Sequence, residues 1–285
     1  MPRIARQEAQ HRLSYFRSGS LGGVEFARCE FRGPLAPTVL DHRWVFSVCD
    51  AGLAHATWRG ETHVISDGAF FTRRPGELAA VRRRESPLTR HRIIFVEPER
   101  VSAVLGERAN GGHVNPPPVL QPGHPVAFAF EALFTAATGG APAIEQETSF
   151  ASFIEALASS PSPPPPEPPR LAPRVTLARE QRARAVELAR RHLEDHYSED
   201  VPLEQLASVA GVSKYHLIRL FRAELELPPH AYLLAIRVDR ARSLILTGLP
   251  LIEVASRTGF ADQSHFTRHF KRLVGIAPGA YARSG

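Results

Sequence analysis

The stretch that decides the fold occurs twice, as LEQLASVAGVSKYHLIRLFR over residues 203–222 and as LIEVASRTGFADQSHFTRHFKR over residues 251–272. Identical residues align at an offset of 48 before the central turn and at 49 after it, so the second copy carries one inserted residue. The identical pairs are Leu203/Leu251, Ala207/Ala255, Ser208/Ser256, Gly211/Gly259, His216/His265, Arg219/Arg268, Phe221/Phe270, Pro229/Pro278, Ala231/Ala280 and Tyr232/Tyr281. A repeat of this length indicates one supersecondary unit used twice.

Each copy predicts two helices joined by a tight turn. The first helix is expected to end at Gly211 or Gly259, because glycine adopts the left-handed conformation that stops a helix. Ser213 and Asp262 are expected to cap the second helices with their side-chain oxygens. This pattern is a helix-turn-helix, whose second helix is suited to lie in a DNA major groove.

Polar and basic residues remain on the outward face of each second helix once the apolar positions are buried. They are Lys214, Tyr215, Ile218, Arg219 and Arg222 in the first copy and Gln263, Ser264, His265, Thr267, Arg268 and Lys271 in the second. Arginine can bond guanine through its paired fork, glutamine and serine can bond base edges, and lysine neutralises phosphate. A solvated helix face is the alternative. Recurrence of the stripe on the same element of both copies favours contact with DNA.

The charge of the chain is concentrated in the same region. Residues 174–285 hold 17 basic and 12 acidic residues, whereas residues 1–173 hold 18 and 17. Nearly all of the net charge of +6 therefore lies in the C-terminal part, which is compatible with nucleic-acid binding without establishing it.

A proline-rich segment divides the chain of 285 residues. Residues 159–173 include eight prolines, which exclude a helix interior or a central strand and predict an extended spacer. We expect an α+β protein of two domains, residues 1–158 and 174–285, joined by this linker. The pattern after it is helical from Arg179 onward, and Asp200 is expected to cap the next helix.

The first half of the chain predicts short strands followed by two helices. The segments WVFSVC, ETHVIS, GAFFTR and HRIIFVE, between residues 40 and 97, are rich in β-branched and aromatic residues and are separated by turns containing glycine. This spacing favours a β-sandwich or small β-barrel. Residues 126–137 and 143–158 then show helical periodicity, and these amphipathic helices are expected to cover the open side of the barrel or to form a dimer seam.

The C-terminal part resembles the AraC/XylS family of bacterial transcription regulators. The resemblance is carried by GFADQSHFTRHFKR, by the following glycine and Pro-x-x-Tyr, and by LEQLASVAGVSKYHLIRLFR, and it covers residues 179–282. It implies a double helix-turn-helix domain of seven helices, in which a long helix at about residues 229–246 joins the two units. It further implies base contacts from Tyr215, Ile218, Arg219, Ser264, His265 and Arg268 and phosphate contacts from Lys214, His216 and Lys271. Where the family often has a polar residue, Ile218 is apolar and is expected to contact a thymine methyl group or no base.

The resemblance also implies a cupin-like N-terminal domain that binds a small-molecule effector. The candidate ligand-binding residues are His42, Trp44, Phe46, Trp58, Phe71 and His91, which are aromatic or polar strand residues that also suit a core. Two alternatives stay open. The N-terminal half is either an interaction module without a ligand, or a cupin enzyme that binds a metal through His42, His55, His63 and His91.

The remaining patterns argue against other classes of protein. We find no nucleophile elbow or glycine-rich phosphate loop, and we expect no catalytic residue, cofactor or metal site. Cys29 and Cys49 are expected to be buried thiols, with a redox pair as the alternative. No stretch suits a signal peptide or a membrane span, so the cytoplasm is the expected location.

The expected function is that of a sequence-specific regulator of transcription. Its expected partners are a double-stranded DNA operator with direct repeats, a small-molecule effector and RNA polymerase. We expect an activator that forms a homodimer through its N-terminal half.

Overall fold

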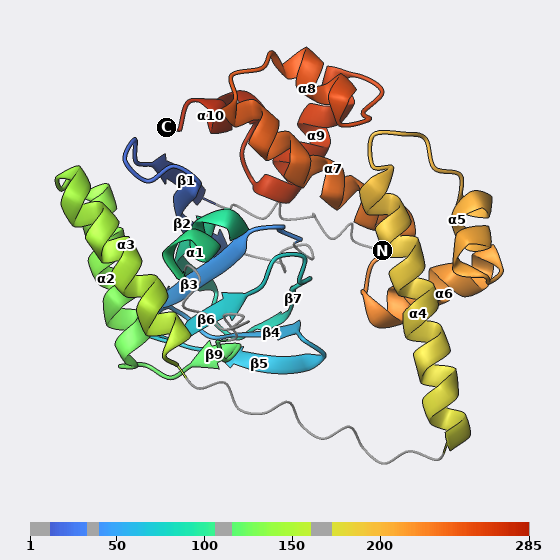
Figure 1. The fold of residues 1–285 in the computed structure, drawn as a ribbon, viewed down its shortest axis with the longest axis horizontal. Helices are drawn as coiled ribbons and strands as arrows, with labels where there is room; N and C mark the ends of the chain where they lie inside the picture. Colours follow the sequence, from blue (N-terminus) through green and yellow to red (C-terminus); the bar gives the residue numbers. More distant parts are fainter. Residues whose placement is uncertain (1–11, 33–39, 106–115, 161–172, 285) are drawn as a thin grey trace, which may run out of the picture. The chain divides into compact units, whose positions relative to one another are not determined.

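Most strands precede residue 97 and helices predominate after it, as the change of periodicity predicts (Figure 1). The structure, a computed structural model, describes residues 12–32, 40–105, 116–160 and 173–284. These residues form two compact units. Most of the predicted spacer, residues 161–172, lies outside the described residues.

The first unit combines nine strands and three helices among the described residues. They are β1 Arg12–Arg17, β2 Val24–Arg32, β3 Trp44–Ala51, β4 Ala54–Trp58, β5 Glu61–Ile65, β6 Phe70–Arg73, β7 Ala80–Arg84, β8 Leu88–Val96, α1 Pro98–Leu105, β9 Val119–Leu120, α2 Pro125–Thr138 and α3 Ala143–Ala158. The strands form one sheet of order β1-β2-β8-β3-β6-β9 and another of order β5-β4-β7. Because the two sheets share no paired strand in the described part of the chain, the expected closed, cupin-like barrel is not found.

Both faces of β3, an inner strand of the larger sheet, are buried, which explains its nearly continuous apolar sequence. On one face, Phe46 and Phe70 pack against Phe130 of α2 and Phe153 of α3. On the other face, Cys49 belongs to a second cluster shared with the smaller sheet. The apolar faces of α2 and α3 thus cover the sheet. A dimer interface formed by these helices would therefore have to use their outer faces.

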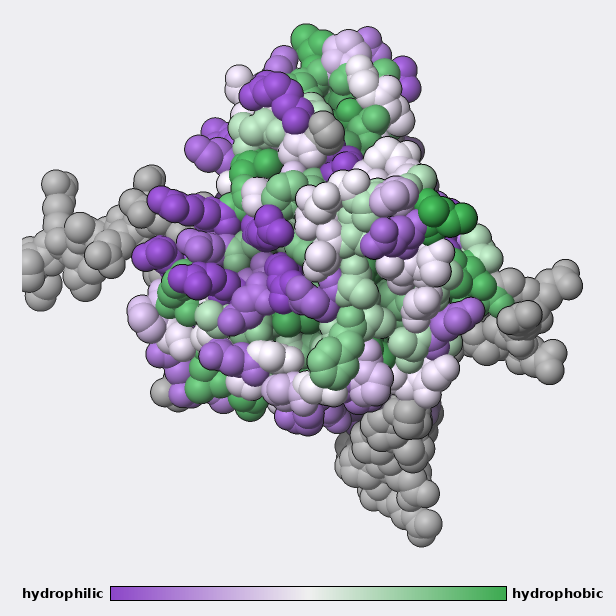
Figure 2. Space-filling model, turned by 90° about the vertical axis from the view of Figure 1, so that its left-hand side faces the viewer, coloured by the Kyte–Doolittle hydropathy of each residue, from purple (hydrophilic) through white to green (hydrophobic). Residues whose placement is uncertain are grey.

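Figure 2 looks onto the side of the molecule where α2 and α3 lie, with strongly hydrophilic side chains beside hydrophobic ones. Two large apolar residues are exposed on these helices. Phe128 of α2 is 67% exposed and Ile144 of α3 is 79% exposed. Neither contributes to the cores described above.

The second unit is helical throughout its described residues. Its helices are α4 Pro173–Asp195, α5 Leu203–Ala210, α6 Lys214–Glu224, α7 Pro229–Leu246, α8 Leu251–Arg257, α9 Gln263–Val274 and α10 Pro278–Ala282. These are the seven helices that the family resemblance implies, and α7 has the expected bounds. The cap predicted at Asp200 is wrong, because α5 begins after Pro202 without a side-chain cap.

None of the helices that the structure describes combines the length and apolar character needed to cross a membrane. The longest, α4, contains basic and acidic residues along its whole length.

Candidate nucleic-acid interface

The two sequence copies fold as two helix-turn-helix units with matching turns. Gly211 ends α5 at φ +67°, and Gly259 follows α8 at φ +76°, so both occupy the left-handed conformation. The residue after each glycine bonds back to the repeated alanine. Val212 N–H donates to the Ala207 carbonyl at 3.1 Å, and Phe260 N–H donates to that of Ala255 at 2.9 Å. The inserted residue therefore falls after Phe260.

The second helix of each unit begins at the predicted cap. The Ser213 hydroxyl accepts a hydrogen bond from the His216 N–H at 3.3 Å, and the Asp262 carboxylate accepts one from the His265 N–H at 2.7 Å. These bonds satisfy N–H groups that a helix start leaves without an intrahelical partner. They fix the start of α6 and α9 at equivalent points of the repeat.

The repeated aromatic residues hold each second helix in place. Phe221 of α6 lies edge-on to Tyr232 at 6.0 Å between ring centroids, and Phe270 of α9 lies edge-on to Tyr281 at 5.5 Å. All four rings are fully buried. Pairs of this geometry stabilise by about 0.5–1.5 kcal/mol beyond their burial.

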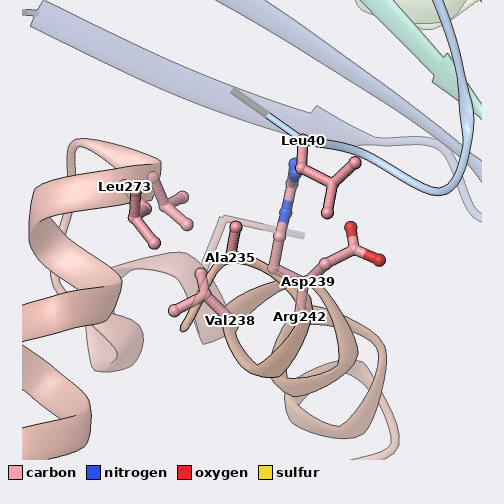
Figure 3. Close-up of a pocket in the computed structure, with 7 residues that line it drawn as sticks. Leu40, Ala235, Val238, Asp239, Arg242 and Leu273 are labelled. Carbon is pink, nitrogen blue, oxygen red and sulfur yellow. The ribbon is translucent and has the colours of Figure 1, made fainter. Parts of the chain in front are cut away.

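The helix that joins the units carries part of the same core. Val238 of α7 lies on the side that faces α9, with Leu273 of α9 across from it (Figure 3). Further along α7, the Arg242 Nε lies 3.3 Å from the Tyr281 hydroxyl of α10. The orientation of α9 is therefore fixed by α7 and α10 together.

The predicted DNA-contacting residues all lie on α6 and α9, outside these buried faces. The exposed ones are Tyr215, Arg219, Arg222, Gln263, Ser264, Arg268 and Lys271. The partly exposed ones are Lys214, His216, Ile218, His265 and Thr267. The predicted residues of the first copy lie together on α6, and those of the second copy lie together on α9. Helix α9 contains no acidic residue, and α6 contains only Glu224, at its last position.

Lys214 differs from the other basic residues of this surface because it already has an acidic partner. Its Nζ lies 2.7 Å from the Glu204 Oε1 of α5. The hydrogen bond from Lys214 holds the pKa of Glu204 below its usual value. A phosphate at this position would have to compete with Glu204 for Lys214.

His269 of α9 is partly exposed and lies one helical turn after the predicted residue His265. Its ring centroid lies 4.6 Å from that of His265. Burial, together with the nearby charge of Arg272, lowers the pKa of His269 to about 4. The ring is therefore neutral at pH 7.

Arg237 of α7 is a second feature that the repeat alone does not reveal. Its guanidinium donates to the carbonyls of Tyr197 and Glu199 at 2.7 and 2.8 Å. Residues 197–199 form the turn after α4, and a Cβ at Gly259 would lie 2.7 Å from the Ser198 carbonyl oxygen. We call the two hydrogen bonds of Arg237 the Arg237 clamp; they hold the turn before α5, whose Ser198 lies close to Gly259 in the turn before α9.

The helix-turn-helix domain family matches residues 206–284 of the chain, from within α5 to beyond α10. The C-terminal unit is an AraC/XylS-type helix-turn-helix domain. Within the AraC/XylS-type domain, the match includes the second helix of each unit, α6 and α9, and the α7 helix between them.

Relatives of the AraC/XylS-type domain are named as regulators. The chain is 44% identical over 73 residues to an uncharacterized HTH-type transcriptional regulator, YbfI of Bacillus subtilis, covering 26% of each chain. It is 35% identical over 91 residues to the probable transcriptional regulator LumQ of Photobacterium leiognathi, covering 32% of this chain and 37% of LumQ. The chain spans only 26% of the length of YbfI and 37% of that of LumQ.

Among solved structures, ToxT from Vibrio cholerae aligns with 97% of each chain at 12% identity and a TM-score of 0.48.

The candidate ligand-binding residues of the first unit do not form one group. Trp44 and Phe46 lie on the face of the larger sheet that packs against α2 and α3. Phe71 and His91 lie on the opposite face, where Trp58 of the smaller sheet joins them. His42 precedes β3 and is partly buried. A single pocket lined by all six is therefore not formed.

The histidines of the alternative metal site are also separated by their own contacts. His55 pairs with Glu85 at 3.0 Å, and the His63 Nε2 lies 3.3 Å from the Trp58 carbonyl oxygen. Within the described ranges, no three His, Cys, Asp or Glu side chains are placed to hold a metal ion.

Cys29 and Cys49 are buried thiols, as expected. Each lies opposite His91 in the sheet, on the strands flanking β8. Two strand spacings of about 4.8 Å place their Cα atoms beyond the roughly 7 Å that a disulfide spans. Burial raises the pKa of Cys49 to about 12 and lowers that of His91 to about 4. A redox pair is excluded by this geometry.

Proposed function

We propose that the protein is a sequence-specific DNA-binding regulator of transcription that acts in the cytoplasm. The observation that carries the proposal is the pair of capped helices α6 and α9, which present basic and polar side chains from equivalent positions of a repeat. A face of this kind on a helix-turn-helix fits the major groove of DNA.

In this function, the two recognition helices enter successive segments of the major groove. Arg219 and Arg268 contact guanine edges through their planar forks, and Ser264 and His265 bond neighbouring base edges. Lys271 and His216 contact phosphates, which position the domain without selecting a sequence. Lys214 reaches a phosphate only by leaving Glu204.

We further propose that the N-terminal unit controls this binding. The exposed Phe128 and Ile144 support self-association through α2 and α3, and a homodimer would bind a direct repeat of the site. A small effector held by the N-terminal unit would favour one conformation by binding it more tightly than the other. Bound at a promoter, the dimer would activate RNA polymerase.

The test is selection of binding sites from a random DNA pool, first with residues 174–285 and then with the full chain. Two short motifs about one helical turn apart are expected for the domain, because each unit then occupies its own groove segment. A doubled site is expected for the full chain. Failure of the full chain to enrich any sequence above the starting pool would contradict the proposed function.

Lys271→Ala is expected to weaken binding to all DNA sequences alike. Lys271 is exposed in the last turns of α9, so its charge neutralises phosphate instead of selecting a base. Loss of one phosphate contact flattens the plot of log affinity against log salt by about one unit. Fluorescence anisotropy at four salt concentrations measures the slope. The control Lys271→Arg should keep it, and an unchanged slope in Lys271→Ala would place this residue away from DNA.

Glu204→Gln is expected to strengthen DNA binding about two- to fivefold, because the interaction free energy of an exposed ion pair corresponds to a change in affinity of this size. The substitution releases Lys214 from its carboxylate partner and leaves it available for phosphate. Glu253→Gln is the matched control. It removes the same charge from α8, where Glu253 pairs with Arg257 and not with a recognition helix. Equal gains in both variants would mean that only the net charge matters.

A further inference from the structure

The N-terminal unit has a hollow on the larger sheet, beyond the part that α2 and α3 cover. Its volume is about 430 Å³, which lies within the usual range of roughly 300–1,000 Å³ for ligand pockets. We call it the arginine groove, and its charged lining residues are Arg12, Arg28, Glu30, Asp50, Arg90 and Arg92.

Strand register explains why arginines gather here. Arg28 of β2 lies directly opposite Arg92 of β8, and Arg90 lies opposite Glu30 in the next row. Side chains at alternate positions of a strand share a face, so these residues point the same way. An irregularity of β3 at residues 49–51 interrupts the register there, and Asp50 reaches Arg92 from this point. Like charges directly opposite each other in a sheet are destabilising, and here the charge of Arg92 is offset by Asp50 and by Glu131 of α2.

The acidic residues of the groove are already engaged by two of its arginines. Glu30 lies 3.2 Å from Arg90, and Asp50 lies 2.7 Å from Arg92. Arg92 also pairs with Glu131 of α2. Among the described residues, no carboxylate forms an ion pair with Arg28.

Aromatic rings hold the Arg28 guanidinium in place. It lies 5.3 Å from the centroid of the Phe16 ring and 5.4 Å from that of Phe134. The Arg92 guanidinium lies 5.5 Å from the same Phe134 ring. Two cations therefore flank one ring, and stacking leaves the fork of Arg28 oriented in advance for a planar or tetrahedral anion.

We propose that the arginine groove binds a small organic anion carrying at least two carboxylate or phosphate groups. One group pairs with the fork of Arg28, which forms no ion pair with a carboxylate among the described residues, and a second reaches Arg12 on the neighbouring strand. This anion is the effector of the regulator, a role that rests on the proposed function.

The experiment is titration calorimetry of the full chain with citrate and, separately, with inorganic pyrophosphate, at constant ionic strength and without DNA. One anion is expected to bind per chain, and the tighter of the two identifies carboxylate or phosphate as the preferred group. Arg28→Gln is expected to weaken that binding at least tenfold. Because Arg28 is exposed, its substitution should leave the melting temperature without ligand nearly unchanged, which is measured in parallel.

Arg82→Gln is the matched control, since it removes the same charge from an exposed position on β7 of the smaller sheet. It should bind the anion as the unaltered chain does. The proposal is overturned if neither anion gives saturable heat, or if Arg28→Gln and Arg82→Gln bind alike. Neither result bears on site selection from the DNA pool, so failure of the groove and failure of the DNA-binding function are distinguishable.

Discussion

Gly259→Ala is expected to destabilise the protein by about 2–5 kcal/mol, whereas Gly211→Ala at the equivalent turn should cost only about 1–2 kcal/mol. Both glycines have positive φ, so both alanines carry the cost of the left-handed conformation. Only Gly259 meets a second obstacle. A Cβ there would lie 2.7 Å from the Ser198 carbonyl oxygen and 2.9 Å from its carbonyl carbon, whereas nothing lies within 4 Å of a Cβ at Gly211.

The obstacle at Gly259 cannot be removed by rotating a side chain. It is backbone, and the Arg237 clamp holds that backbone through the carbonyls on both sides of Ser198. Overpacking of this kind adds roughly 1–3 kcal/mol to the conformational cost. Urea unfolding of the two variants, followed by circular dichroism, measures the difference. Equal losses of stability would mean that the turn at 197–199 yields easily and that the clamp is weak.

Arg268→Ala is expected to lower affinity for the selected DNA site by about 1–3 kcal/mol, or roughly 5- to 150-fold, and to relax base preference at one position. Arg268 is exposed near the middle of α9, and the ion pairs of the described residues do not include it. Its fork is therefore available for a base edge. Anisotropy titrations on the selected site and on sites changed at single positions measure both effects.

Arg191→Ala is the control for this prediction. It removes the same charge from an exposed position on α4, where Arg191 pairs with Glu187. A small, sequence-independent loss is expected, because only the long-range charge has changed. If Arg268→Ala shows the same small loss and selects the same bases as the unaltered chain, α9 does not contact bases through this residue.

The C-terminal helices were predictable because the signals for them are local. A glycine after each first helix and an oxygen-bearing cap before each second helix fix the boundaries within a few residues of sequence, and the structure places both there. The Arg237 clamp was not predictable in this way. It joins residues about 40 positions apart, and only tertiary packing brings them together.

The N-terminal unit was less predictable from local sequence signals than the C-terminal helices. The sequence predicted β3, β5, β6 and β8 but not the other strands of the described residues. In β1 and β2, charged residues interrupt the apolar pattern. Glu25 of β2 is almost fully buried and is accommodated by Arg17 and Arg43. The candidate ligand residues divided between two faces for a related reason. The face that each aromatic strand residue occupies depends on the register of strand pairing, which the residue types alone do not reveal.

The Arg237 clamp is also expected to limit which DNA sites the protein accepts. Because α7 holds the turn before α5, and that turn lies close to Gly259 in the turn of the second unit, we expect α6 and α9 to keep a fixed separation and orientation. One extra base pair between the two recognised motifs moves the second motif about 3.4 Å along the axis and turns it by roughly a tenth of a revolution. A rigid pair of helices cannot follow that displacement. The interval between the motifs should therefore be invariant among functional sites, even where the bases within it are not.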